Sequence, residues 1–323
     1  MRTGKLSESV LKRSILKQVK NRRQEVIQGA GIGKDCAFFS FGEELLAIST
    51  ASFSVFEEDS VFGRIIESVN NVAAGGAAPV GILISAVLPE ETGEQEIKAL
   101  MAEVEKACCR LNIQAAGGDT RISREVNRPQ LTVTVVGKAG RGKYPSRVCA
   151  ANQDVVMTKW AGLSGTAFLA KKNTDKLVKR LPAHLIHEAA AFGEMLSVLP
   201  EAAAAAEYGV SSMHDVSRGG VFTALWELAE GAGVGLEVDL KKIPIRQETV
   251  EICEILGVNP YELYGAGSLL IVCDKGNQLA GMLKQENIYA AVIGKTTADK
   301  AKVLWNQEEK RYLDRPRIDM GCL

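Results

Sequence analysis

Residues 113–120, Ile-Gln-Ala-Ala-Gly-Gly-Asp-Thr, decide how the first half of the chain folds. The stretch begins with residues 113–116, of which Ile113, Ala115 and Ala116 are apolar, and they predict a short strand. We expect this strand to open into a loop at Gly117-Gly118-Asp119-Thr120, because glycine next to Asp and Thr is typical of loops. Alternating Thr and Val at residues 131–137 predict a further strand after the loop.

Two helices and a strand precede this stretch in the sequence. Helical spacing predicts a helix up to residue 111, with Thr92 and Gln95 placed as a capping box at its start. Residues 80–88 read as a strand, and an amphipathic helix ends near residue 74 before a Gly-Gly pair. The order of strands and helices, with two crossovers, predicts an α+β domain.

The second half is organised around residues 213–221, Met-His-Asp-Val-Ser-Arg-Gly-Gly-Val. We expect this stretch to be a loop that opens a helix over residues 221–232. Further strands and helices on both sides predict a second α+β unit of similar size. Small and polar residues at 140–152 separate the two halves, which gives domains at residues 1–140 and 153–323.

Composition excludes several classes of protein. The 323 residues suffice for about two domains, and 39 basic residues balance 39 acidic ones. A neutral chain does not attract nucleic acid or an anionic membrane at long range, so neither is expected as a partner. No stretch is apolar enough to span a membrane, and the seven cysteines form no Cys-x-x-Cys pair. We therefore expect a reduced, cytoplasmic protein.

Two carboxylates beside glycines, Asp35 and Asp119, could hold Mg²⁺ in a phosphate site. Mg²⁺ favours a few carboxylates together with water and substrate phosphates, and glycines allow a nucleotide to approach the backbone. Ordinary turn chemistry is the alternative for either motif taken alone.

The segment around His214 and Asp215 offers a second candidate site. Arg218 and the Gly219-Gly220 turn at a helix start suit an anion, because a guanidinium, free backbone N–H groups and the positive end of the helix dipole would coincide. The alternative is a simple N-cap by Asp215 or Ser217 that needs no ligand.

The motifs, taken in order, resemble the aminoimidazole ribonucleotide (AIR) synthase superfamily, and within it the HypE-like and AIR synthase-related proteins. The resemblance runs from about residue 4 to residue 294. The motifs that carry it are GIGKDCAF, STASF, VNNVAAGGAAP, AAGGDT, HDVSRGGV and GAGSLLIV.

The resemblance implies a two-domain α+β architecture. The sheet of the N-terminal domain would pair with that of a second subunit to form a dimeric β-barrel, and a C-terminal α+β sandwich domain would cover the site. ATP and Mg²⁺ would bind near the dimer interface, and a γ-phosphate would activate an amide or carbonyl oxygen. In HypE this reaction dehydrates a thiocarbamoyl group on a C-terminal cysteine, so Cys322 is a candidate carrier thiol.

The resemblance also implies roles for individual residues. Asp35 and Asp119 match metal-binding positions, but Ala51 and Asn71 stand where the superfamily usually has Asp. Asn71 still offers a neutral oxygen and Ala51 offers none, so Mg²⁺ and ATP should bind more weakly or differently. The remaining implied contacts to nucleotide or acceptor come from Lys34, Gly117, Gly118, Thr120, Asp215, Arg218, Gly219 and Gly220.

Three functions remain open at this point. The first is a homodimeric ATP-dependent enzyme that acts on a small molecule or a protein thiol, with a hydrogenase-maturation factor as a possible partner. The second is a non-catalytic nucleotide-binding or scaffold protein with a degraded metal site. The third is a small-molecule kinase similar to thiamine-monophosphate kinase.

Overall fold

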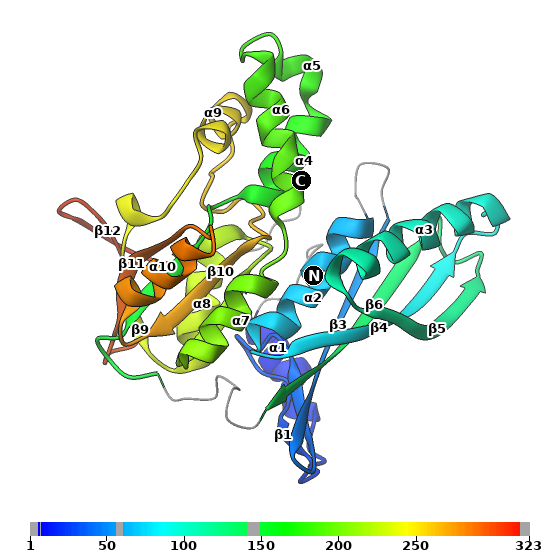
Figure 1. Ribbon diagram of the computed structural model, residues 1–323, viewed down its shortest axis with the longest axis horizontal. Coiled ribbons are helices and arrows are strands. Elements are labelled where there is room, and N and C mark those ends of the chain that lie inside the picture. Colours follow the sequence, from blue (N-terminus) through cyan, green and yellow to red (C-terminus); the bar gives the residue numbers. More distant parts are fainter. Residues whose placement is uncertain (1–5, 7, 56–60, 141–148, 317–323) are drawn as a thin grey trace.

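A computed structural model describes residue 6 and residues 8–55, 61–140 and 149–316. The chain forms two sheets, one in each half, with helices packed against them (Figure 1). None of the helices in these ranges is long and apolar enough to cross a membrane.

The first sheet has six strands in the order β1-β2-β3-β6-β4-β5. All neighbouring strands are antiparallel except β4 and β5, which are parallel and joined through a helix. The elements of this half are α1 (Glu8–Ser14), a 3₁₀ turn (Leu16–Gln18), β1 (Val26–Gln28), β2 (Ala37–Phe41), β3 (Glu44–Ser54), α2 (Val61–Ala74), β4 (Ala78–Leu88), α3 (Glu94–Leu111), β5 (Gln114–Ile122) and β6 (Gln130–Gly140).

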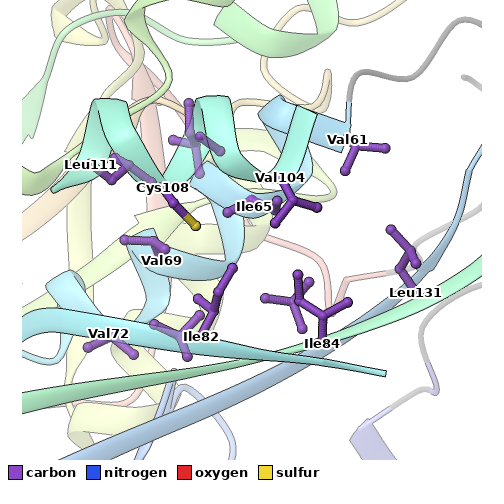
Figure 2. Close-up of a cluster of buried hydrophobic side chains, with 14 of the residues drawn as sticks. Val61, Ile65, Val69, Val72, Ile82, Ile84, Val104, Cys108, Leu111 and Leu131 are labelled. Atoms are coloured by element: carbon purple, nitrogen blue, oxygen red, sulfur yellow. The ribbon is translucent and has the colours of Figure 1, made fainter. Parts of the chain in front are cut away.

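Helices α2 and α3 cover one face of this sheet and bury its apolar side chains (Figure 2). The helical repeat of α2 turns Ile65, Val69 and Val72 toward the sheet, where Ile82 and Ile84 meet them. The opposite face carries a row of hydroxyl pairs between β3 and β6. Thr50 Oγ1 lies 3.1 Å from Thr134 Oγ1, and this row belongs to an open sheet within one chain. A barrel shared with a second subunit stays a prediction.

Two local expectations for this half are wrong. Gly117–Thr120 do not form a loop but lie inside strand β5, at the edge of the sheet. The cap of α3 is also shifted by one residue, because the Gly93 backbone N–H donates to Glu96 Oε2 at 2.7 Å in place of the expected Thr92 and Gln95 pair. Parallel pairing with β4 continues through the glycines and overrides their turn tendency.

The second sheet has seven strands in the order β13-β12-β9-β11-β7-β10-β8. Its strands are β7 (Asp154–Thr158), β8 (Ser212–Val216), β9 (Gly235–Asp239), β10 (Ser268–Cys273), β11 (Ala290–Thr297), β12 (Lys302–Asn306) and β13 (Glu309–Tyr312). Its helices are α4 (Leu163–Lys172), α5 (Thr174–Leu177), α6 (Ala183–Ala191), α7 (Leu199–Tyr208), α8 (Gly220–Ala232), α9 (Gln247–Leu256) and α10 (Gly276–Gln285), with 3₁₀ turns at Phe192–Met195 and Leu240–Lys242.

The stretch around His214 is likewise a strand where a loop was expected. His214 and Asp215 lie in β8, which pairs with the fully buried β10, and only residues 217–219 form the turn into α8. Both residues are therefore held by a sheet, which fixes their backbone more firmly than a loop would.

Helix α2 of the first half packs against the second half. The buried Asn70 side chain donates to Leu196 O at 2.7 Å and accepts from the Val198 backbone N–H at 3.0 Å. This two-way bond holds the segment before α7 against the end of α2. The junction between the two halves is thus ordered by specific hydrogen bonds.

Candidate functional site

Asp35 and His214 meet at the junction of the two halves, although 179 positions separate them in the chain. His214 Nδ1 lies 2.9 Å from Asp35 Oδ2. The His214 side chain is 5% exposed and that of Asp35 is 12% exposed. The contact therefore joins the loop before β2 to strand β8 in a place largely shielded from water.

Glycine at position 33 makes this contact possible. Gly33 has a φ of +65°, and a Cβ there would lie 2.3 Å from the backbone oxygen of Glu227 in α8. Only a residue without a side chain lets the loop lie directly on the helix. The two residues that follow then place Asp35 beside β8.

Glu227 holds the other side of the imidazole. His214 Nε2 lies 3.3 Å from Glu227 Oε2, so both ring nitrogens face carboxylates. Burial lowers the pKa of His214, but Asp35, Glu227 and Asp215 outweigh burial and raise the pKa well above its usual value of 6.5. Carboxylates on both sides of the ring therefore favour its protonated form.

Asp215 completes the cluster. One ligand atom from each of Asp35, His214 and Asp215 lies within 4.8 Å of the others, and Asp215 is 4% exposed. Among the His, Cys, Asp and Glu residues that the structure describes, these three form the single group of this kind. The expected pairing of Asp35 with Asp119 is not part of it.

Asp119 lies instead on the exposed edge strand β5, together with Gly117 and Thr120. Gly118 is required here, since a Cβ would lie 1.7 Å from Ile84 O. The glycines thus allow β5 to pair closely with β4. Within one chain, the Gly-Gly-Asp-Thr stretch faces outward on an uncovered strand, and its contact with a nucleotide stays a prediction.

The two positions where the resemblance implies a carboxylate, Ala51 and Asn71, lie on elements that contact the Asp35-Cys36 segment. Ser49 Oγ donates to Asp35 O at 2.9 Å, and Ala51 is two residues further along β3, on the same face of that strand. Asn71 is one helical turn before Gly75, whose position for a Cβ lies 2.5 Å from Cys36 Sγ. We therefore expect Ala51 in β3 and Asn71 in α2 to lie on the faces nearer to Asp35.

Arg218 lies near Glu67 of α2, so the surroundings of its guanidinium include more than the start of α8. Burial raises the pKa of Glu67, and the positive charges of Arg64 and Arg218 oppose that rise. Arg64 Nη1 donates to Tyr264 Oη at 2.8 Å, and Tyr264 also donates to Glu67. Arg218 thus belongs to a cluster of two arginines, a carboxyl and a phenol beside α2.

Several N–H groups at the Gly219-Gly220 turn are already hydrogen-bonded within the chain. The N–H groups of Gly220, Phe222 and Thr223 donate to the carbonyl oxygens of Ser217, Tyr261 and Gly219. A Cβ on Gly220 would lie 2.4 Å from Tyr261 O, so the glycine permits close packing of two backbone segments. The N-cap residue of α8 is Gly219, whereas the sequence suggested Asp215 or Ser217.

The cysteines near the site are not activated. Burial raises the pKa of Cys36 to about 12, with Asp35 adding to the rise and Lys34 opposing it. A thiol with this pKa carries almost no thiolate at neutral pH and acts as a small apolar side chain. Cys322, the candidate carrier thiol, lies outside the described residues.

The gathered residues differ from those expected at the magnesium site. That site drew on Asp35, Asp119 and Asn71, all oxygen donors, whereas the chain brings an imidazole nitrogen together with two carboxylates. Mg²⁺ strongly favours oxygen ligands. A magnesium site at Asp35, Asp119 and Asn71 therefore stays a prediction.

Sequence reasoning missed Glu227, Glu67 and Tyr264. Glu227 could have been predicted from the sequence, because it lies about two helical turns after the Gly219-Gly220 turn and so on the face of α8 that begins beside β8. Glu67 and Tyr264 are 197 positions apart, and no local pattern links them.

Comparisons with known proteins agree with this architecture. Residues 33–139 match the family model of the AIR synthase related protein N-terminal domain, and residues 150–306 match that of its C-terminal domain. Carbamoyl dehydratase HypE of Rhodobacter capsulatus is 28% identical over 271 residues, which cover 79% of this chain and 76% of that protein.

Two solved structures share the fold. A chain of the HypE–HypF complex superimposes with a TM-score of 0.77 at 18% identity, covering 95% of this chain and 100% of the other. Hydrogenase maturation protein HypE in complex with ATP gives a TM-score of 0.71 at 17% identity, covering 99% and 98%.

Proposed function

The chain belongs to the AIR synthase-related family, and from this premise we propose that it is an ATP-using enzyme with its active site at the junction of its two halves. One observation carries the proposal. Asp35 lies in the N-terminal family domain, and His214 and Asp215 lie in the C-terminal one, yet their ligand atoms lie within 4.8 Å of one another. A buried, charged cluster built from two domains is typical of a catalytic site.

The reaction we propose is ATP-dependent dehydration of a carbamoyl group. The carbamoyl oxygen would attack the γ-phosphorus of ATP and release ADP. The C–O bond to the phosphate would then break while the nitrogen releases two protons, which leaves a nitrile and inorganic phosphate. The similarity to carbamoyl dehydratase HypE over most of both chains supports this choice of acceptor.

Charged residues near the junction would serve this reaction. Asp215 would face the acceptor and accept a proton from its nitrogen, because a carboxylate within reach is a competent general base. Arg218 would stabilise charge that develops on the transferring phosphate. Lys34 would neutralise the nucleotide phosphates, and Asp119 and Thr120 on β5 would contact the nucleotide.

A homodimer would complete the site. Strand β5 is an uncovered edge, and large apolar side chains are exposed on this sheet, with Val80 at 52% and Ile122 at 51%. An uncovered edge and exposed apolar residues favour association with another chain. Pairing of two such sheets would bury Asp119 and bring it into an enclosed site. The HypE–HypF complex supports a second, maturation-factor partner for this chain.

A non-catalytic nucleotide-binding role is the second candidate. Ala51 and Asn71 favour it, because these two positions carry no negative charge where the superfamily usually has Asp. A protein of this kind would bind ATP without turnover, so phosphate release separates the two candidates.

The test uses the full chain treated with cyanate, which carbamoylates accessible thiols, followed by ATP and a divalent cation. We expect release of phosphate together with loss of one water from the carbamoylated C-terminal peptide by mass spectrometry. The Cys322→Ser variant is the matched control and should show no such loss.

The outcomes divide the candidates clearly. Phosphate release without loss of water in the C-terminal peptide would refute Cys322 as the carrier, and transfer to an added alcohol would establish a kinase instead. ATP binding without any phosphate release would establish the non-catalytic role.

A further inference from the structure

We propose that Asp35, His214 and Asp215 form a binding site for a divalent transition-metal ion, with His214 as a direct nitrogen ligand. The proposal concerns the protein without nucleotide and does not depend on ATP use. It is distinct from the magnesium site expected from Asp35, Asp119 and Asn71, which stays a prediction.

The spacing of the donor atoms fits such an ion. Metal–nitrogen and metal–oxygen bonds of about 2.0–2.2 Å place neighbouring ligand atoms roughly 3–4 Å apart. His214 Nδ1 and Asp35 Oδ2 are 2.9 Å apart, and all three ligand atoms fall within 4.8 Å. An ion can therefore enter between them with small side-chain movements.

Glu227 provides an independent indication. A histidine that binds a metal through one nitrogen usually donates its other N–H to a carboxylate, which fixes the tautomer and the orientation of the ring. His214 presents Nδ1 to Asp35 and Nε2 to Glu227 Oε2 at 3.3 Å. Glu227 is a positioning residue in this arrangement, since it acts on the ion only through His214.

The shielding of the three ligands separates them from ordinary surface acids. His214 and Asp215 are each 4% exposed, and β8 and its partner β10 fix their backbone. Three carboxylates, those of Asp35, Asp215 and Glu227, lie around one imidazole. A doubly charged cation is attracted to such a group of carboxylates.

The donor set selects the class of ion. Imidazole nitrogen suits Fe²⁺ and Zn²⁺, and carboxylates suit Mn²⁺, which is a transition-metal ion in the same affinity series, whereas Mg²⁺ favours oxygen donors and retains several waters. Three protein ligands leave coordination positions open, as in catalytic rather than structural metal sites. We therefore expect Mn²⁺ and Zn²⁺ to bind more tightly than Mg²⁺, with open positions that can accept water or an oxygen of a substrate.

The experiment titrates Mn²⁺, and separately Mg²⁺, into the chelator-treated full chain without nucleotide, using calorimetry and the loss of the free Mn²⁺ electron paramagnetic resonance signal. We expect one Mn²⁺ per chain, bound at least about tenfold more tightly than Mg²⁺. His214→Gln should weaken Mn²⁺ binding by at least about tenfold. The exposed His187 on α6 provides the matched control, and His187→Gln should bind Mn²⁺ as the natural protein does.

A second readout keeps the proposal testable where a variant folds poorly. Co²⁺ bound to the natural protein should give a visible ligand-field spectrum, and Glu227→Gln, which keeps a hydrogen-bonding side chain, should weaken Co²⁺ binding by about 10–100-fold. Absence of stoichiometric Mn²⁺ binding, equal affinity for Mg²⁺ and Mn²⁺, or unchanged binding in His214→Gln would each overturn the proposal. Because no nucleotide is present, such a failure leaves the proposed use of ATP to its own test.

Discussion

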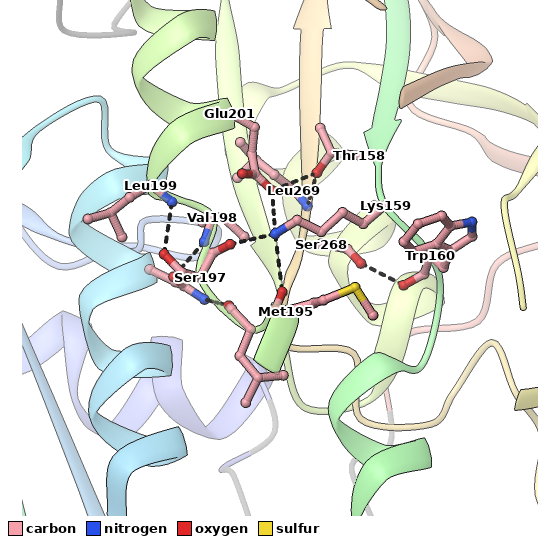
Figure 3. A network of polar contacts seen from close by, with 12 residues as sticks. Thr158, Lys159, Trp160, Met195, Ser197, Val198, Leu199, Glu201, Ser268 and Leu269 are labelled. Carbon is pink, nitrogen blue, oxygen red and sulfur yellow. Dashed lines mark hydrogen bonds and ion pairs between the residues drawn. The ribbon is translucent and has the colours of Figure 1, made fainter. Parts of the chain in front are cut away.

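Two buried polar clusters lie at the junction of the two halves, and they differ in charge. One joins Lys159 to Glu201 (Figure 3), and the other joins His214 to Asp35, Asp215 and Glu227. The first contains one positive and one negative side chain. The second contains three carboxylates around one imidazole.

In the Lys159 cluster, protein groups supply all the partners of the ammonium group. Lys159 Nζ lies 2.9 Å from Glu201 Oε1, donates to Met195 O at 3.1 Å and also donates to Ser197 O. All three ammonium hydrogens thus have acceptors within the chain (Figure 3). The same segment holds Asn70 of the first half, so this cluster keeps the junction in place.

The two clusters differ in whether positive and negative side chains balance each other. The single positive and single negative charge of the first cluster balance each other, although the buried Glu201 Oε2 has no hydrogen-bond partner among the described residues. Several carboxylates around one imidazole instead favour a cation. We therefore assign stability to the Lys159 cluster and ligand binding to the His214 cluster.

The largest expected effect concerns Lys159. Lys159→Met leaves Glu201, whose side chain is fully buried, as an uncompensated charge and should lower the free energy of unfolding by about 3–5 kcal/mol. Urea denaturation measures this loss, and Lys176→Met on the exposed surface is the control. Combining Lys159→Met with Glu201→Met should recover much of the loss, and a double variant as unstable as the sum of the single ones would contradict a paired role.

Asp215→Asn should reduce activity strongly and stability only slightly, in contrast to Lys159→Met. Asp215→Asn keeps a hydrogen-bonding side chain and leaves two carboxylates beside the imidazole, so the metal-free protein should lose less stability than Lys159→Met does. ATP-dependent phosphate release should fall at least about 100-fold, because a general base is lost. Asp175→Asn, an exposed change, serves as control. Stability loss as large as that of Lys159→Met, with activity retained, would reverse the assignment of the two clusters.

Restoring the missing carboxylates tests whether added oxygen donors raise the affinity for Mg²⁺. Ala51→Asp combined with Asn71→Asp adds two oxygen donors on the sides that lead to Asp35, and should tighten Mg²⁺ binding by about tenfold or more. Ala51→Asn with Asn71 unchanged adds a similar side chain without charge and is the control. Calorimetry that finds Mg²⁺ binding unaltered in the double variant would show that these positions do not face the metal.

Glu67, which lies with Arg64, Arg218 and Tyr264, should make a smaller, pH-dependent contribution to stability. Burial raises its pKa in the folded state, so the folded chain holds this proton more tightly than the unfolded chain does. The natural protein should therefore lose stability relative to Glu67→Gln as the pH rises from the usual glutamate range through the raised pKa. Denaturation at several pH values measures the difference. A constant difference, like that expected for the exposed Glu91→Gln, would contradict the raised pKa.

The sequence predicted regular elements better than it predicted contacts. The helix that ends at Ala74, the strand that ends at Leu88 and the helix that ends at Leu111 were recognisable, because their apolar spacing is set locally. Gly117–Thr120 and His214–Asp215 were expected in loops, yet pairing with β4 and β10 makes them strands. Strand partners are far apart in the sequence, so local turn tendencies misled the prediction.

The candidate site was only half visible in the sequence. Asp35 and Asp215 were named from their motifs, but their meeting depends on Gly33 fitting against α8. The expected partnership with Asp119 required residues on β5 to approach Asp35, and the fold places β5 at the sheet edge. Such distances follow from tertiary packing, which motif spacing does not encode.

The most direct test of ATP use at the domain junction is a calorimetric titration of ATP into the natural protein and into Asp35→Asn, with Mn²⁺ and Mg²⁺ in parallel. We predict binding with a Kd of about micromolar order for the natural protein in the presence of a divalent cation. Asp35→Asn should lose at least about tenfold in affinity, since one of the charges that holds the cation is removed. Equal ATP affinity in both proteins, or no binding with either cation, would contradict an ATP site at this junction.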